Sequence, residues 1–420
     1  MYQQLTLPNG ARILTQEVPG ARSAAFGFFV GAGSRHENPA DNGAAHFIEH
    51  MLFKGTEQRS AARLARDMDA IGGQFNAYTT KEHTCFYGRT LDRHLDLGLD
   101  ILEDMVFRSR FDQEDVELER GVILEEIGMY EDTPEDLVSE RLAAAVYKGT
   151  PLARPILGRA STLAAMTGES LAQWQREHYR PGAMVAALAG SFTQAQADRL
   201  RDCLVGLEPG PVPRSRPAAY QPAVTARRKA TEQNHLILAF PAFSYLDDRR
   251  ARLMLFNALL GGGCSSRLFQ EVREKRGLCY SVYSYVADHE DTGLLGIYTA
   301  LGQEQEEQAL ETIYHLVEEL AEHGPTQEEL DRVREQAKAN LLMGTESIQA
   351  RMSQLGAGAL LYGRVREEDE ILALYDAVTR EQLRDLAQAL FVPEGASLSA
   401  LGRVRPAQDY SQWLSKKRGG

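Results

Sequence analysis

The chain has 420 residues and a formal net charge of −13; 43% of the residues are hydrophobic and 25% are charged. This composition is ordinary for globular proteins, and the length predicts at least two domains with substantial cores. The acidic balance argues against nucleic acid as a partner and favours basic partners, and the absence of long apolar runs argues against a membrane-spanning protein.

Residues 1–18 read as a strand, a turn at Pro8-Asn9-Gly10 and a second strand. They contain no charged leader with an apolar run and no Arg/Ser-rich amphipathic segment, so we expect no targeting sequence. The cysteines are scattered and form no C-x-x-C pair, which is typical of free thiols in a reducing compartment. We therefore expect a cytoplasmic bacterial protein. The cysteines are Cys85, Cys203, Cys264 and Cys279.

An almost entirely apolar segment, residues 44–53, contains His46, Glu49 and His50. At about 100° per residue, the three polar side chains share one face of a helix. Two imidazoles at this spacing can bind one zinc ion, and the carboxylate between them can act on its water. The alternative is a pair of core histidines with satisfied hydrogen bonds. A catalytic zinc site needs a third protein ligand, since its fourth position is left to water.

The expected third ligand is a distant carboxylate, and residues 115–132 read as a helix rich in acids. Glu119 and Glu126 are seven residues apart, so they lie about 20° apart around the helix axis. Both flank the apolar side at Val122 and Ile123. Most acids on so charged a helix form a solvated face, which leaves Glu119 and Glu126 as the two candidates.

Four prolines and a glycine within residues 207–217 predict an extended linker between a first domain at 1–206 and a second at 218–420. Both halves contain a helix, a glycine turn and a strand, at 64–79 and at 268–284. We therefore predict an α+β fold of two homologous α/β-sandwich-type domains. Each has an antiparallel-rich sheet packed by helices, and internal duplication relates the two.

The second half has no counterpart of the histidine pair. When the halves are aligned on Gly73 and Gly277, Arg250, Leu253 and Met254 stand opposite the zinc-motif positions. We expect no metal site in the second domain.

Three motifs resemble the pitrilysin/insulinase family of zinc peptidases, the inverzincins, and especially bacterial relatives of the mitochondrial processing peptidase β-subunit. The resemblance covers essentially the whole chain and implies a metalloendopeptidase with one Zn²⁺ per chain. The family's third ligand matches Glu126, and its glutamate two turns earlier, which supports catalysis, matches Glu119. The motifs are GAAHFIEHMLFKGT at 43–56, GGQFNAYTTKEHT at 72–84 and ERGVILEEI at 119–127.

The same resemblance implies substrate-binding residues in the second domain. VREKRGLCYSV at 272–282 is similar to the family's Arg/Tyr motif, so Arg273 and Tyr280 are expected to bind the peptide and Tyr280 to stabilise the oxyanion. In this family two such domains enclose a chamber, and chains of this length form pairs. A homodimer is therefore expected.

Further substrate contacts are implied on both sides of the predicted zinc site. Phe75, Asn76 and Ala77 match an edge strand that adds an extended peptide through main-chain hydrogen bonds. An ordinary strand with one buried face would look the same. Asp136 and Glu140 match positions that hold a substrate arginine in the processing-peptidase branch, against the alternative of a solvated acidic face.

We therefore predict a zinc-dependent endopeptidase that cleaves extended or unfolded peptides in an interdomain chamber, with a processing peptidase as one form of this activity. Zinc would be held by His46, His50 and Glu126, and Glu49 would serve as the base. One alternative is a catalytically silent structural or partner subunit of the same family. Another is an acidic carrier with an incidental zinc site, which would need neither a third ligand nor an Arg/Tyr pair.

Overall fold

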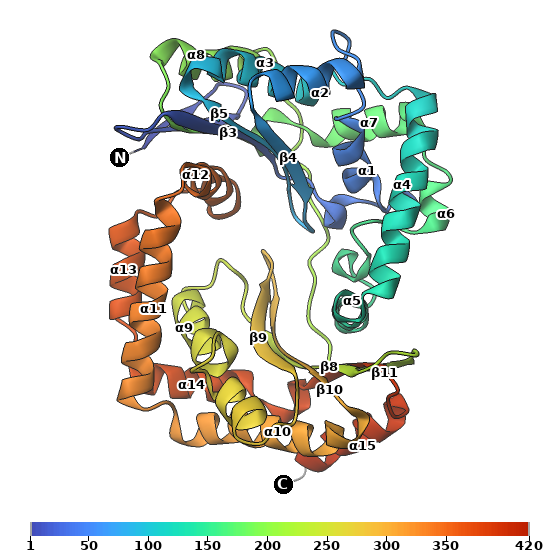
Figure 1. The fold of residues 1–420 in the computed structure, drawn as a ribbon, viewed down its shortest axis with the longest axis vertical. Coiled ribbons are helices and arrows are strands. Elements are labelled where there is room, and N and C mark those ends of the chain that lie inside the picture. Colours follow the sequence, from blue (N-terminus) through green and yellow to red (C-terminus); the bar gives the residue numbers. More distant parts are fainter. Residues whose placement is uncertain (1, 419–420) are drawn as a thin grey trace. The chain divides into compact units, whose positions relative to one another are not determined.

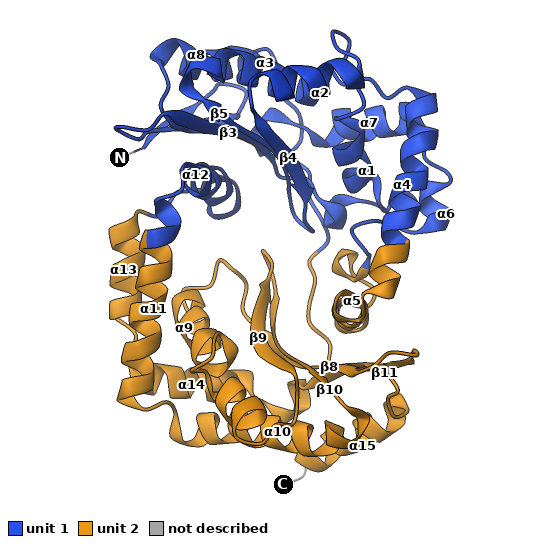
Figure 2. Cartoon of the chain, in the orientation of Figure 1, with its two compact units in different colours: residues 1–127, 154–216, 343–366 blue, residues 128–153, 217–342, 367–420 orange. Residues whose placement is uncertain are grey.

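A computed structural model describes residues 2–418 and divides the chain into two compact units (Figures 1 and 2). Unit 1 comprises the residues up to 127 together with 154–216 and 343–366. Unit 2 comprises 128–153, 217–342 and the residues from 367 onward. Each unit combines one sheet with several helices, as the predicted α+β fold requires.

Unit 1 contains a six-stranded sheet with the strand order β1-β2-β6-β3-β5-β4. Neighbouring strands are antiparallel except for the parallel pair β2 and β6. The strands are β1 (Gln3–Thr6), β2 (Arg12–Glu17), β3 (Ser23–Val30), β4 (Gln74–Thr79), β5 (Thr84–Leu91) and β6 (Met184–Gly190). The helices are α1 (Ala44–Met51), α2 (Ala61–Ala70), α3 (Leu95–Phe107), α4 (Gln113–Asp132), α6 (Ala160–Leu163), α7 (Gly168–His178), α8 (Gln194–Val205) and α12 (Ile348–Tyr362).

Both faces of the unit 1 sheet are buried, because alternate residues of β3 are apolar on both sides. Phe26 and Phe28 join a cluster with residues of α1, α3 and α7, whereas Phe29 joins a second cluster with residues of α12. Figure 1 shows α3 and α12 on opposite sides of β3 and β5. A Cβ atom at Gly356 would lie 2.0 Å from the Phe29 ring, so glycine is what allows α12 to approach this closely.

Unit 2 contains a five-stranded sheet with the strand order β7-β11-β8-β10-β9, parallel only between β7 and β11. Helix α5 covers one face, and α9, α10, α14 and α15 contribute to the cluster on the other. The strands are β7 (Val224–Arg228), β8 (Asn234–Ala242), β9 (Ser281–Asp288), β10 (Gly293–Leu301) and β11 (Ser397–Gly402). The helices are α5 (Pro134–Val146), α9 (Arg250–Gly261), α10 (Glu306–His323), α11 (Gln327–Thr345), α13 (Glu368–Asp376), α14 (Arg380–Leu390) and α15 (Ala407–Arg418).

The two sheets share one topology. Five strands of the unit 1 sheet follow the order β2-β6-β3-β5-β4, and those of unit 2 follow the order β7-β11-β8-β10-β9. When each set is numbered along the chain, both orders are first, fifth, second, fourth and third. In both units the first and fifth strands form the parallel pair. Gly72 and Gly277 have φ values of 58° and 61° and precede β4 and β9, which are the edge strands at corresponding positions. This agreement is what internal duplication predicts.

The compact units differ from the predicted domains by two helical segments. Residues 128–153, which include α5, belong to unit 2, and residues 343–366, which include α12, belong to unit 1. Each of these helices buries an apolar side on a sheet face of its unit. Residues 206–223 contain neither helix nor strand, and the change from unit 1 to unit 2 falls between 216 and 217.

All four cysteines are free, as predicted from their spacing. Cys85 is buried on β5, whereas Cys264 is exposed. Among residues 2–418, none of the helices combines the length and apolar character needed to cross a membrane.

Candidate metal centre

Helix α1, which carries both predicted histidines, begins without a side-chain cap of its own. Its N-cap residue is Gly43, with a φ of 105°. A carboxylate from outside the helix takes the place of the cap: Oε2 of Glu37 accepts from the Gly43 N–H at 2.9 Å, and Oε1 accepts from the Ala45 N–H at 2.9 Å. The Asn42 amide also donates to Glu37 Oε2, at 2.8 Å. A negative group is favoured at this helix end because the free N–H groups carry partial positive charge.

Glu37 is only 4% exposed. Burial raises its pKa to about 7, against the opposing hydrogen bonds from Asn42, Ala45 and Gly43. Glu37 was not singled out from the sequence. The available signal was a predicted helix that starts with Gly43-Ala44-Ala45 and therefore lacks the Ser, Thr, Asp or Asn that usually caps a helix. That signal does not say which distant group supplies the cap.

The three predicted zinc ligands lie together in unit 1. Oε2 of Glu126, on α4, is 3.6 Å from Nε2 of His46 and 3.5 Å from Nε2 of His50. One ligand atom from each of the three residues can be chosen so that all lie within 4.8 Å of one another. In a tetrahedral zinc site with bonds of about 2.1 Å, neighbouring ligand atoms are roughly 3.4 Å apart. The observed distances therefore fit a zinc ion bound between these side chains.

The two histidines are in different surroundings. His46 is buried, and desolvation followed by the nearby His50 lowers its pKa to about 3, so its imidazole is neutral and able to bind a metal. Its Nδ1 has no hydrogen-bond partner among the described residues. His50, in contrast, has Nδ1 2.8 Å from Oε1 of Glu119. A carboxylate in this position fixes the ring orientation and makes Nε2 a better ligand.

Glu119 therefore contacts the predicted ligand His50, and it lies on the opposite side of the His50 ring from Glu126. It is buried, and its second carboxylate oxygen forms an ion pair with the ammonium of Lys54. The Lys54 charge compensates a carboxylate that would otherwise be costly to bury. Lys54 was not singled out from the sequence, although it follows His50 by four residues, a spacing that brings side chains together along a helical path.

Glu49 is held by a hydroxyl group from the sheet. The Thr79 hydroxyl, at the end of β4, donates to Oε2 of Glu49 at 2.5 Å. Burial raises the pKa of Glu49, an effect opposed by the Thr79 hydrogen bond and by His50 and reinforced by Glu126. A carboxylate with a raised pKa is a stronger base. Thr79 was also missed, because its position beside the helix depends on sheet and helix packing together.

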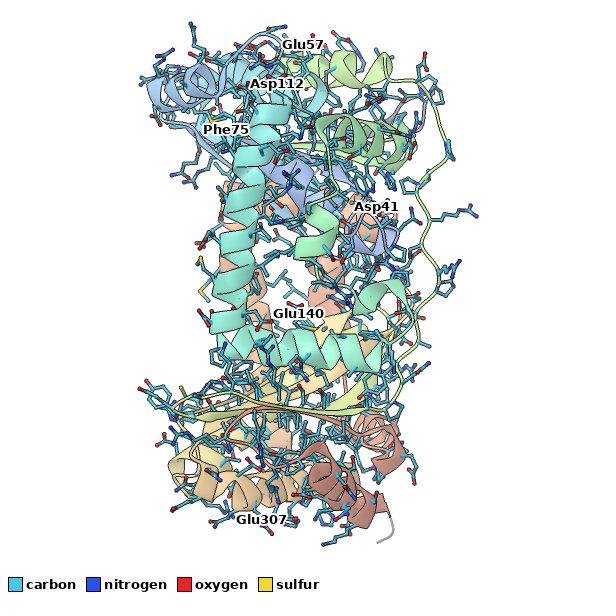
Figure 3. The ribbon with its side chains drawn as sticks, turned by 90° about the vertical axis from the view of Figure 1, so that its right-hand side faces the viewer. Asp41, Glu57, Phe75, Asp112, Glu140 and Glu307 are labelled. Atoms are coloured by element: carbon cyan, nitrogen blue, oxygen red, sulfur yellow. The ribbon has the colours of Figure 1, made fainter. Side chains whose placement is uncertain are left out.

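The predicted peptide-binding strand is β4, which is the last strand of the unit 1 sheet and, among the strands of residues 2–418, pairs with β5 alone. Asn76 is exposed, and its side-chain oxygen accepts from the Ala77 N–H. Ala77 is buried, and Phe75, labelled in Figure 3, is half-buried. The Phe75 ring lies edge-on to that of Phe26, with 6.0 Å between the ring centroids. An edge strand with free main-chain groups can accept another strand, while Phe75 and Ala77 also serve the core.

Arg273 and Tyr280 are brought together in unit 2. Arg273 lies in a π-helical turn, Phe269–Glu274, and its guanidinium group is 5.7 Å from the centroid of the Tyr280 ring and 4.7 Å from that of Phe269. Tyr280 is 74% exposed. A large aromatic side chain this exposed contributes little to the core, so its ring and hydroxyl are accessible to a ligand.

Asp136 and Glu140 lie one turn apart on α5, and both are exposed. Figure 3 labels Glu140 on this helix. Partial burial, together with the neighbouring Glu135, raises the pKa of Asp136.

Comparisons with known proteins give a family for both halves of the chain. Residues 12–160 match the family described as insulinase (peptidase family M16), and residues 165–337 match the peptidase M16 inactive domain. The chain is 41% identical to YmxG, an uncharacterized zinc protease of Bacillus subtilis, over 94% of this chain and 97% of that protein. It is 40% identical to an uncharacterized zinc protease of Streptomyces coelicolor, over 97% of this chain and 90% of the relative.

Two crystal structures share the fold. A peptidase M16 inactive domain from Pseudomonas fluorescens has a TM-score of 0.90 at 23% identity, covering 96% of this chain and 99% of that one. A protease from Helicobacter pylori has a TM-score of 0.88 at 19% identity, with the same coverage.

Proposed function

Because this chain belongs to the insulinase family of peptidases, peptidase family M16, we propose that it is a zinc-dependent endopeptidase that cleaves extended or unfolded peptides. The observation that carries the proposal is the meeting of His46, His50 and Glu126, with nitrogen-to-oxygen distances that suit one zinc ion. The names of the B. subtilis and S. coelicolor relatives, both zinc proteases, support the same metal.

His46, His50 and Glu126 would hold the zinc ion, which would supply Lewis-acid activation of a water molecule and of the scissile carbonyl. Glu49 removes the proton from the attacking water at its carboxylate and returns it to the leaving amine. The Thr79 hydroxyl fixes one oxygen of that carboxylate, which limits the number of orientations that Glu49 can adopt. Glu119, charge-compensated by Lys54, holds the His50 ring through Nδ1.

For the substrate, we propose that the free edge of β4, including Phe75, Asn76 and Ala77, pairs with the extended main chain of the peptide. Arg273 and Tyr280 donate hydrogen bonds to peptide carbonyl groups, and Tyr280 also stabilises the oxyanion.

Two exposed acids on α5, Asp136 and Glu140, give the proposed peptidase a preference for basic side chains. The overall charge of −13 also favours the attraction of basic peptides.

The test uses an unstructured peptide mixture, with cleavage products mapped by mass spectrometry. The wild-type protein should cleave it. Glu49→Gln keeps the shape of the side chain but removes the proton acceptor, so it should retain zinc and lose about 10³-fold in turnover. Glu125→Gln, which changes an exposed acid on α4, is the matched control and should retain full activity. Turnover above a tenth of wild type in Glu49→Gln would remove Glu49 from the role of base.

The same experiment separates the peptidase from its rival, a silent partner subunit of the same family. A wild-type protein that binds one zinc per chain but cleaves nothing would support the rival. A cytoplasmic location, a homodimer and a processing role are further parts of this proposal, and light scattering of the zinc-loaded protein checks the dimer.

A further inference from the structure

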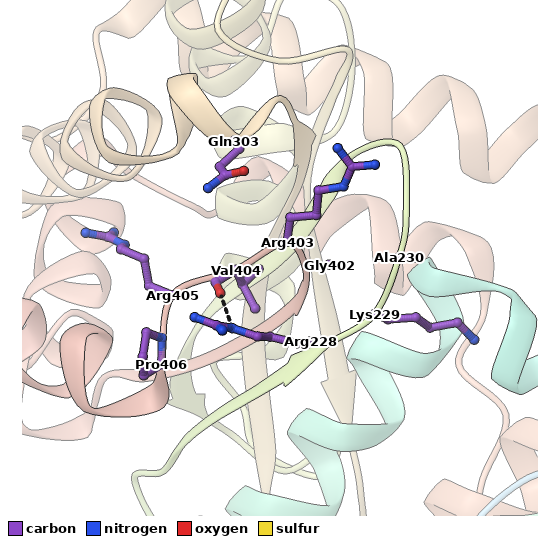
Figure 4. A pocket seen from close by; sticks show the side chains of 9 residues that line it. All are labelled: Arg228, Lys229, Ala230, Gln303, Gly402, Arg403, Val404, Arg405 and Pro406. Carbon is purple, nitrogen blue, oxygen red and sulfur yellow. Dashed lines mark hydrogen bonds between the residues drawn. The ribbon is translucent and has the colours of Figure 1, made fainter.

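Unit 2 contains an open cavity of about 590 Å³ on its surface, and cationic side chains predominate in its lining (Figure 4). Three segments line it: the end of β7 with the two residues that follow, Gln303 ahead of α10, and the connection between β11 and α15. The lining includes four cations and no acidic residue. The lining residues are Arg228, Lys229, Ala230, Gln303, Gly402, Arg403, Val404, Arg405 and Pro406.

Two of the four cations already have acidic partners. The Arg405 guanidinium donates to the buried carboxylate of Glu306 at 3.0 Å, and Lys229 forms an ion pair with Asp132 at 3.2 Å. These pairs hold the side chains in place and reduce their charge.

Arg228 and Arg403 differ from the other two cations because neither has an acidic partner within residues 2–418. Arg228 donates to the main-chain carbonyl of Val404 at 3.2 Å, as Figure 4 shows, and within residues 2–418 it has no carboxylate in ion-pair range. Arg403 is exposed and has neither an ion pair nor a side-chain hydrogen bond in the same part of the chain. Two arginines without acidic partners beside one cavity are unexpected in a chain with a net charge of −13.

We propose that this cavity binds a small phosphorylated molecule, with Arg228 as a principal ligand and with the exposed Arg403, whose guanidinium group points away from Arg228 in Figure 4, turning to join it. The planar guanidinium group presents paired N–H donors that match phosphate oxygens, and such charge-assisted bonds are stronger than neutral ones. The Gln303 amide offers a neutral donor. The volume lies within the range of small-molecule sites and exceeds what a single phosphate ion would fill.

The test uses the full-length, zinc-loaded protein and pyrophosphate as the probe, with the dissociation constant measured by isothermal titration calorimetry. Arg228→Gln and Arg403→Gln should each weaken binding about tenfold, and the double variant about a hundredfold, because each change removes a charge-assisted contact. Arg66→Gln, which removes an exposed arginine from α2 in unit 1, is the matched control and should bind like wild type. The Arg403 side chain has no ion pair or hydrogen bond within residues 2–418, so the melting temperature of Arg403→Gln should be unchanged.

The readout does not depend on the proposed peptidase activity. Zinc content is measured in parallel, since pyrophosphate can also bind zinc. A double variant with the wild-type dissociation constant, or no binding by wild type up to about 10 mM, would overturn the site. Citrate is the second arm of the titration. If citrate binds as tightly as pyrophosphate, the cavity recognises polycarboxylates and the assignment to phosphate is wrong.

Discussion

Glu119 contacts His50 at Nδ1, the ring nitrogen that faces away from Glu126, the third predicted ligand. Oε1 of Glu119 lies 2.8 Å from Nδ1 of His50, whereas Oε2 of Glu126 lies 3.5 Å from Nε2 of the same ring. With its proton on Nδ1, the imidazole donates to Glu119 and keeps the Nε2 lone pair for a metal. The two acids that the sequence left as candidates thus have distinct positions: Glu126 lies beside Nε2 of both predicted histidine ligands, and Glu119 lies behind the His50 ring.

We predict that Glu119→Gln weakens zinc affinity about 10–100-fold without removing the metal site. The amide lacks the negative charge that makes His50 a stronger ligand, and it no longer pairs with Lys54. Zinc affinity is measured by competition with a calibrated chelator, and Glu125→Gln on the same helix is the control. Wild-type affinity in Glu119→Gln would mean that the bond to His50 serves the fold alone.

A second prediction concerns the metal itself. Changing His46, His50 or Glu126 to Ala should remove most of the zinc, because two protein ligands do not make a stable tetrahedral site. Zinc per chain is counted by atomic emission after dialysis, with Glu125→Ala as the control. In the wild-type protein, 1,10-phenanthroline should abolish peptide cleavage and added zinc should restore it. Full occupancy in Glu126→Ala would move the third ligand elsewhere, with Glu119 the next residue to test.

The third prediction tests whether unit 2 takes part in catalysis. Arg273→Ala should lower kcat/KM roughly 10–100-fold, the effect of losing one charge-assisted hydrogen bond, and Tyr280→Phe should mainly lower kcat. Zinc content and melting temperature should not change, since Tyr280 is 74% exposed. Arg276→Ala is the matched control, because this nearby arginine pairs with Glu271. Unchanged kinetics in both test variants would leave unit 2 as a scaffold.

The fourth prediction follows from the raised pKa of Glu37, about 7 against the ordinary 4.5. Between these values the folded protein binds more protons than the unfolded chain, so this group's contribution to stability is present below pH 4.5 and is lost as pH rises through about 7. The free energy of unfolding of wild type, measured in urea at pH 5 and pH 8, should therefore fall by roughly 2–3 kcal/mol from this group.

Glu37→Gln cannot titrate, so this component of the pH dependence should be absent in the variant. The variant should also be less stable at pH 5 by about 1–3 kcal/mol, because its amide N–H₂ faces the backbone donors of α1. Equal pH dependence in both proteins would contradict the raised pKa.

Much of the candidate site could be predicted from the chain alone, because its geometry is local. His46, Glu49 and His50 share a helix, and the helical period alone places them on one face. The same helical period left two acidic residues of α4, Glu119 and Glu126, as candidates for the third ligand. The period was less accurate in predicting the apolar side of that helix: Ile123 is buried as predicted, but Val122 is 50% exposed. The family suggested by three motifs is confirmed by relatives of 40–41% identity.

The sequence by itself determined the helix of the two histidines and the two candidate acids, because each depends on periodicity within a short segment, and it determined the repeated α+β architecture through the similar segments in the two halves. Only the tertiary structure decided which helices complete which sheet: α5 belongs to unit 2 and α12 to unit 1. It also decided that Glu37 caps α1 and that Thr79 holds Glu49. These contacts join residues from separate segments, and they arise because buried apolar faces and buried polar groups must find partners wherever the packed chain brings them.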